Sequence, residues 1–114
     1  MMQGEYSVSL KDMIEALKLE NCTPDVDIND IMITQNEVNR PSRIQIIGHV
    51  EHTYMQQKGM EHSVAMMERI MAGSEDKGQP PCIVYCREIW VEDEIVALAN
   101  KYRVPLLRSR KATS

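Results

Sequence analysis

The first apolar pattern along the chain is that of a helix. Ser9 and Asp12 suit its first turn, where a hydroxyl can cap backbone N–H groups and an acid favours the helix dipole. Four apolar residues follow at the i, i+3, i+4 and i+7 positions of one helix face, namely Leu10, Met13, Ile14 and Leu17. Residues 21–25, which include Pro24, are predicted to break this helix.

The next stretch predicts a short strand or two, separated by Asn29-Asp30. Its apolar residues are Val26, Ile28, Ile31 and Ile33. Residues 34–42 are polar and contain a proline. We therefore predict that these nine positions form a loop.

From residue 43 the chain alternates between strand and helix patterns. The predicted strands are residues 43–48, 82–86 and 104–107. The predicted helices run from about Val50 to Gln57, from Met60 to Met71, and from an acidic first turn at Glu92 to Tyr102. This order implies parallel strands joined by helical crossovers. The predicted fold class is α/β, a three-layer α/β/α-like domain with a mostly parallel, mixed sheet.

Composition and charge narrow the possible classes. The 114 residues fit one domain, and a formal net charge of −4 argues against a dedicated nucleic-acid binder. No apolar run approaches membrane-spanning length, and the first residues lack the apolar core of a signal peptide. Three cysteines are too few for a disulfide framework, so we expect a cytoplasmic location. With nine Met and no Phe, the core is expected to consist mostly of Ile, Leu, Val and Met.

The end of the chain differs in charge from the rest. Residues 101–114 carry five basic residues and no acidic one, whereas the preceding residues are acidic on balance. This basic segment is either a solvated chain end or a surface that meets an anion, an acidic partner or the body of its own domain.

A phosphate loop is absent from the predicted strand-to-helix turns. Gly73 and Gly78 have its spacing, but Gln79 and Pro80 stand where that motif needs Lys and Ser or Thr. The segment also precedes a strand, whereas a phosphate loop follows one and opens a helix.

Neither the cysteines nor the histidines predict a metal site. On one strand Cys82 and Cys86 would face the same side about 13 Å apart, too far to share a zinc ion. His49 and His52 stand at i and i+3 and could bind a metal weakly, but no third ligand accompanies them, so we interpret them as part of a surface helix start. Trp90 follows a predicted strand, and three interpretations are open for it: a core residue, a loop anchor or a contact with a partner. We assign no catalytic residue, metal or cofactor.

Three motifs, in order along the chain, resemble those of one family. They are the strand Arg43–Gly48 followed by Glu51 and Tyr54, the run Pro81–Arg87 followed by an acidic helix start, and the stretch Ala99–Ser109 closing on Thr113-Ser114. Their order and spacing resemble the amino-terminal domain of HPr kinase/phosphorylase, over almost the whole chain. Two positions depart from that family. The polar segment Thr34 to Ser42 is shorter and lacks aromatic residues, and Glu88 stands close to where the family has a glycine.

The resemblance implies a specific setting. The family is a bifunctional bacterial enzyme that phosphorylates and dephosphorylates a serine of HPr in the phosphotransferase system, and thereby controls carbon catabolite repression. Its phosphate loop, catalytic acid and magnesium ligands lie in a carboxy-terminal domain, so no catalytic residue is carried over. The implied fold is similar to the amino-terminal domain of certain Mur ligases. Residues 1–108 would form this domain and residues 109–114 the start of an interdomain linker or tail.

Two functions follow as alternatives. The first is a non-catalytic accessory or regulatory domain, whose partners would be the catalytic domain or subunits of a parent HPr kinase, or HPr itself. As an isolated domain it would be a monomer or a weak dimer. The second is a free-standing small-ligand sensor similar to the DRTGG domains. A ligand would then bind at the carboxyl ends of the parallel strands, where the nearest residues are Gly48, His49, Arg87, Glu88, Arg108 and Ser109.

Overall fold

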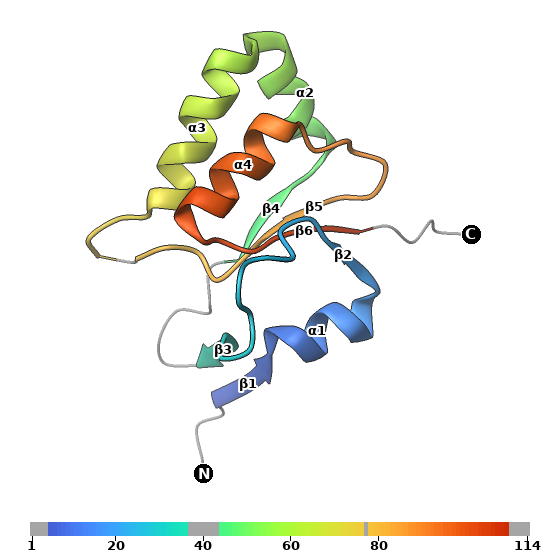
Figure 1. Cartoon of the computed structure of the whole chain (residues 1–114), viewed down its shortest axis with the longest axis vertical. Helices are drawn as coiled ribbons and strands as arrows, with labels where there is room; N and C mark the ends of the chain where they lie inside the picture. Colours follow the sequence, from blue (N-terminus) through green and yellow to red (C-terminus); the bar gives the residue numbers. More distant parts are fainter. Residues whose placement is uncertain (1–4, 37–43, 77, 110–114) are drawn as a thin grey trace.

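A four-stranded sheet with structure packed on both faces organises the domain (Figure 1). The computed structural model describes residues 5–36, 44–76 and 78–109. The elements are β1 (Glu5–Ser9), α1 (Leu10–Leu17), β2 (Leu19–Asn21), β3 (Met32–Asn36), β4 (Gln45–Ile47), α2 (His49–Lys58), α3 (Met60–Ala72), β5 (Ile83–Tyr85), α4 (Asp93–Tyr102) and β6 (Leu106–Ser109). No helix within the described ranges is long and apolar enough to cross a membrane.

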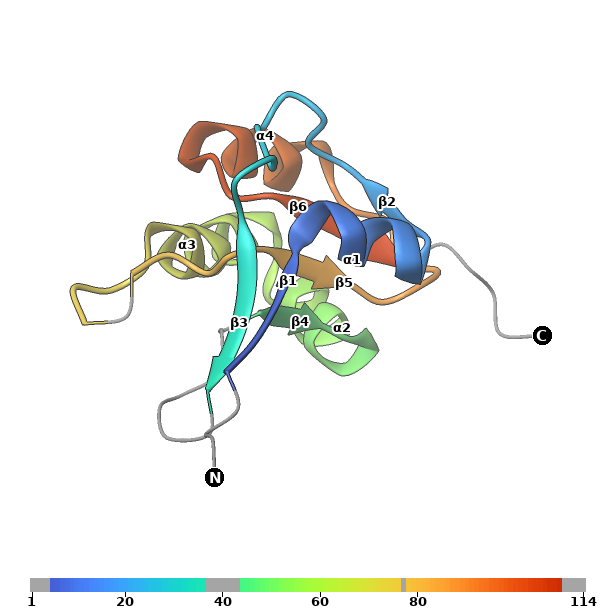
Figure 2. The same cartoon turned by 90° about the horizontal axis from the view of Figure 1, so that it is seen from below.

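The sheet has the order β2-β6-β5-β4 and confirms the predicted fold class. Strands β4, β5 and β6 are parallel, with Ile47 opposite Tyr85 and Tyr85 opposite Arg108. Strand β2 adds an antiparallel edge against β6. Helices α2, α3 and α4 cover one face (Figure 1), while α1 and an antiparallel β1–β3 ribbon lie over the other (Figure 2). The carboxyl ends of the three parallel strands therefore share one edge of the domain.

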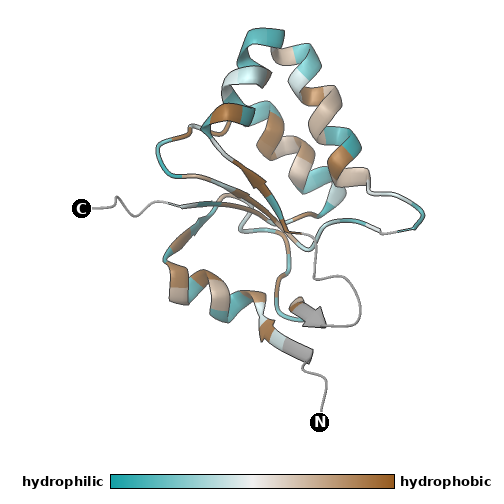
Figure 3. Ribbon diagram, turned by 180° about the vertical axis from the view of Figure 1, so that it is seen from behind, coloured by the Kyte–Doolittle hydropathy of each residue, from teal (hydrophilic) through white to brown (hydrophobic). Residues whose placement is uncertain are grey.

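Successive side chains of the strands point to opposite faces of the sheet, and a hydrophobic core lies on each face. On β5, Ile83 and Tyr85 face the core beneath α2, α3 and α4, whereas Val84 faces the side of α1. Adjacent β6 residues divide in the same way, Leu106 joining the first core and Leu107 the second. Figure 3 shows hydrophobic residues concentrated on these strands. The helix-side core also contains the three methionines Met55, Met67 and Met71, as expected from the composition.

The helices form where the sequence predicts them. Ser9 caps α1 by accepting a hydrogen bond from the backbone N–H of Asp12, at 3.0 Å. At the start of α2 the carboxylate of Glu51 accepts from the backbone N–H of Gly48, also at 3.0 Å. The α4 helix ends at Tyr102, and the following residue, Arg103, has the left-handed φ of 58° that closes many helices.

The first third of the chain holds the errors of prediction. Strand β2, Leu19–Asn21, begins directly after the left-handed Lys18 that ends α1; no strand was predicted there, and the helix was expected to break only at residues 21–25. Residues 26–30 form turns, not a strand: Val26 bonds back to Thr23, and Asp27 accepts from the backbone of Asn29. Polar side chains that hydrogen-bond the nearby backbone compete with strand formation.

The remaining differences between prediction and structure concern β1 and β3, two strands that pair with each other across a long stretch of sequence. Strand β3 continues through residues 34–36, which were predicted as loop, because they pair with β1. The rest of the predicted 34–42 loop lies outside the described residues. Strand β1 itself carries no strong pattern and was not predicted. It is paired in an antiparallel ladder with β3.

Candidate functional site

The six candidate site residues lie at the carboxyl ends of β4, β5 and β6, but they divide into two groups. Gly48 and His49 stand at the junction of β4 and α2, where the imidazole Nε2 of His49 lies 3.1 Å from the backbone oxygen of Arg87. This contact joins the α2 start to the loop after β5. His49 also borders a shallow depression of about 360 Å³ on α2, lined by Val50, Thr53, Tyr54 and Gln57.

Arg108 and Ser109 belong to the second group, on the β2 side. Ser109 pairs with Leu19 in the β2–β6 ladder. The Arg108 guanidinium donates to the carboxylate of Glu20 on β2, with Nε at 3.1 Å and Nη2 closer still. Its Nη1 lies 3.4 Å from the backbone oxygen of Ile89. The positive charge of Arg108 is therefore directed to its own domain, one of the alternatives that the basic end of the chain left open.

Glu88, in the loop between β5 and α4, has a backbone conformation that few residues adopt. Its φ is 68°, in the left-handed region that glycine enters without a steric penalty. A glycine at this position would adopt the same conformation at no steric cost. The Glu88 side chain itself is exposed.

Trp90 is the feature of this loop that sequence reasoning left undecided. Its side chain is 70% exposed, whereas its neighbours Ile89 and Val91 are 2% and 5% exposed. Trp90 is therefore not a core residue. The guanidinium carbon of Arg108 lies 5.6 Å from the centre of its ring, which places a cation against one part of an otherwise accessible indole.

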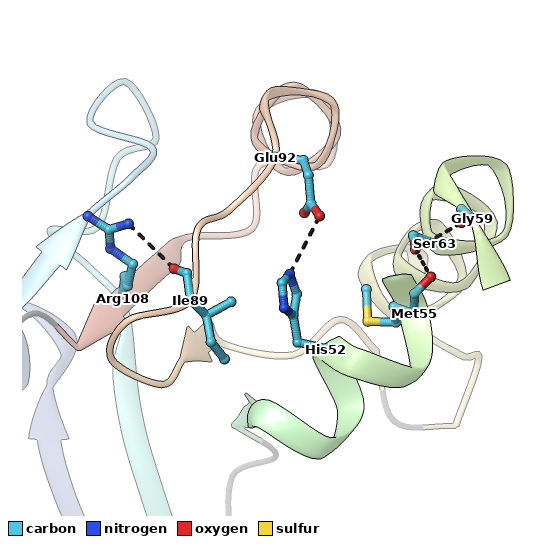
Figure 4. A network of polar contacts seen from close by, with 7 residues as sticks. All are labelled: His52, Met55, Gly59, Ser63, Ile89, Glu92 and Arg108. Atoms are coloured by element: carbon cyan, nitrogen blue, oxygen red, sulfur yellow. Dashed lines mark hydrogen bonds and ion pairs between the residues drawn. The ribbon is translucent and has the colours of Figure 1, made fainter. Parts of the chain in front are cut away.

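A buried polar cluster lies behind this loop and joins α2 to α4 (Figure 4). The imidazole Nε2 of His52 is 3.5 Å from Oε2 of Glu92, which precedes α4. The Tyr85 ring meets the His52 ring edge-on, with centroids 6.3 Å apart. Burial, reinforced by the negative charges of Glu92 and Cys22, raises the pKa of the Tyr85 phenol far above its usual value.

The cluster is incompletely satisfied. Within the part of the chain that the structure describes, His52 Nε2, Tyr85 OH and Glu92 Oε1 are buried and make no hydrogen bond. Sequence reasoning placed His52 on a surface helix start, which is wrong, because the residue is only 8% exposed. The sequence did contain a signal for this burial, because His52 stands three residues before the buried Met55 and so shares the inner face of α2.

The histidine and cysteine pairs that were weighed as metal ligands do not converge. His49 is exposed and contacts Arg87, whereas His52 is buried against Glu92. Cys82 packs on the α1 side of the sheet and Cys86 on the other, because β5 ends between them at Tyr85; the expectation that they face one side is wrong. The described ranges contain no group of three or more His, Cys, Asp or Glu residues placed to hold a metal ion.

The segment with phosphate-loop spacing forms a tight turn before β5. The backbone N–H of Gly78 donates to the backbone oxygen of Ser74 at 2.7 Å. A Cβ atom on Gly73 would lie 2.4 Å from the oxygen of Gly78, so the turn excludes any side chain there. Gln79 then anchors the segment by donating to the backbone oxygens of Met71 and Tyr102. These contacts give the segment a structural role.

Comparison with known proteins adds a consistent result. Residues 8–114 match the sequence model of the family described as HPr Serine kinase N terminus. The HPr kinase/phosphorylase of Lachnoclostridium phytofermentans is 40% identical over an alignment 122 residues long. The alignment covers 96% of this chain and 38% of that protein. The corresponding enzyme of Caldanaerobacter subterraneus is 30% identical, with 94% and 37% covered. That of Alkaliphilus metalliredigens is 27% identical, with 95% and 37% covered. The chain thus spans well under half the length of these relatives.

Proposed function

Because the chain belongs to the family of HPr serine kinase N-terminal domains, we propose that it is a non-catalytic accessory domain that regulates or assembles an HPr kinase/phosphorylase. The observation that carries the proposal is the extent of the match: almost all of this chain aligns, but with only 37–38% of each relative compared above. Under this proposal, phosphorylation and dephosphorylation of the HPr serine, and hence control of carbon catabolite repression, take place in the remaining portion.

The polar groups at the strand ends support a structural role over small-ligand sensing. The Arg108 guanidinium, which an anionic ligand would need, is already paired with Glu20. A phosphate group would have to displace this carboxylate before it could bind. Trp90 at this edge is a large apolar side chain that is 70% exposed, which suits a protein surface better than a sugar phosphate or nucleotide phosphate.

A phosphotransfer assay tests the proposal directly. The chain, incubated with ATP, Mg²⁺ and HPr, is expected to yield no phosphoserine above the blank. A chimera in which this chain replaces the matching region of the Lachnoclostridium phytofermentans enzyme is expected to phosphorylate HPr. Phosphoserine formed by the chain alone, or a correctly folded chimera without activity, would contradict the proposal.

A thermal-shift screen separates the accessory role from the sensor alternative. We expect the melting temperature of the chain to change by less than about 1 °C with nucleotides or sugar phosphates at millimolar concentration, because only a ligand that binds the folded chain stabilises it. A rise that grows with ligand concentration and disappears in Arg108→Gln would favour a sensor.

A further inference from the structure

Trp90 is held in an outward position by its neighbours. Ile89 and Val91 on either side of it are buried in the helix-side core, 2% and 5% exposed, whereas Trp90 between them is 70% exposed. The loop is further fixed because Arg108 donates to the backbone oxygen of Ile89 and His49 contacts that of Arg87. The exposure of Trp90 is therefore a consequence of the packing of its loop.

A second set of contacts orients the indole itself. The Arg108 guanidinium lies against the Trp90 ring and is in turn fixed by the Glu20 carboxylate. We call these three residues the Trp90 patch. Trp and Arg are the residues most enriched where protein interfaces gain their binding energy. Side chains already ordered in the free protein lose little conformational entropy when a partner binds.

The position of the patch indicates which partner it meets. Strands β5 and β6 are parallel, with Tyr85 opposite Arg108, so the loop after β5 and the carboxyl end of β6 lie at the same edge of the sheet. In the relatives, the portion beyond the matched N-terminal region is more than half of the protein. A portion that follows this domain would be joined to it beyond β6, at the edge where Trp90 is exposed.

We infer that the Trp90 patch is the surface through which this domain docks onto the catalytic portion of an HPr kinase/phosphorylase. The inference rests on the proposed function, since it names the contact by which the accessory domain acts. Trp90 would be inserted into an apolar recess of the partner. The Arg108–Glu20 pair would lie at the rim of the contact, where ion pairs contribute orientation more than affinity.

Hydroxyl-radical footprinting of the chain and of the chimera tests the contact. In the isolated chain Trp90 is expected to be oxidised rapidly, because 70% of its surface is exposed. In the chimera its oxidation rate is expected to fall by about fivefold or more, as expected for the core of an interface. Tyr54 on α2, which is 48% exposed and distant in sequence, serves as the internal control and is expected to be oxidised equally in both proteins.

Two results would overturn the inference. Equal oxidation of Trp90 in the chain and in an active chimera would show that the domain acts through another surface while the proposed function stands. Protection of Trp90 in the isolated chain that increases with protein concentration would show that a second copy is the occupant. Loss of phosphorylation by the unmodified chimera would instead count against the proposed function.

Matched substitutions give an independent measurement. Docking should raise the melting temperature of this domain in the chimera above that of the isolated chain, because a partner that binds only the folded domain stabilises it. Trp90→Ala is expected to abolish this increment while leaving the isolated chain nearly unchanged. Val50→Ala, at an 81% exposed position on α2, is expected to retain it. An increment that persists in Trp90→Ala would refute the inference.

Discussion

Glu88 allows the backbone strain of the β5–α4 loop to be measured by a single substitution. Its φ of 68° places a non-glycine residue in the left-handed region, which costs about 1–2 kcal/mol. Glycine removes this cost but loses about 0.5–1 kcal/mol of backbone entropy on folding. Glu88→Gly should therefore raise the free energy of unfolding by about 0.5–1 kcal/mol, which is about 2–5 °C in melting temperature for a domain of this size.

The strain argument predicts that glycine changes the free energy of unfolding in opposite directions at positions 88 and 65. Ala65 is exposed in the middle of α3, where Ala65→Gly should lower the free energy of unfolding by about 1 kcal/mol. Glu88→Ala removes the same side chain as Glu88→Gly but keeps a Cβ atom, so it should bring no gain. Urea denaturation of the three variants measures these differences. If Glu88→Gly destabilised the chain as Ala65→Gly does, the strain argument would be refuted.

Three further substitutions test the cores on either side of the sheet. Thr23→Val removes the buried hydroxyl that accepts from the backbone N–H of Leu106 at 3.0 Å, and urea denaturation should show a loss of about 1–3 kcal/mol, against almost none for the exposed Thr53→Val. Tyr85→Phe removes a buried hydroxyl that lacks a partner among the described residues, so calorimetry should show unchanged or higher stability. Burial raises the pKa of Cys82 from 9.0 to about 11. The folded state therefore holds this proton more tightly, and stability present below pH 9 should decline from pH 9 to 11 by up to about 1.4 kcal/mol per pH unit. Denaturation midpoints across that range should decline less steeply in Cys82→Ala, and an identical slope would contradict the assignment.

The second half of the fold could be predicted because its signals are local. The β5 run is apolar on both faces, as a central parallel strand requires, and glycines separate the helices. The resemblance of the motifs around Arg87 and Arg108 then indicated the family, which comparison with known proteins confirmed.

The first third could not be predicted because its strands depend on distant partners. Strand β2 is three residues long and only partly buried, and it forms because β6, almost ninety residues later, offers an edge. At the candidate site, strand order correctly placed Gly48 and Arg108 at one edge of the sheet. It could not show that Glu20 reaches Arg108, since that contact arises from the same unpredicted β2–β6 pairing.

The order of the strands also governs when the domain can form during synthesis. Strand β6, the last in sequence, lies between β2 and β5, the interior of the sheet. Until residues 106–109 leave the ribosome, β2 has no neighbour, and the backbone groups of β5 that face β6 stay unpaired. The four-stranded sheet can therefore be completed only when β6 is available to pair with β2 and β5. A stalled nascent chain whose residues before β6 have all left the exit tunnel should thus be more sensitive to protease around β2 and β5 than one that also exposes β6.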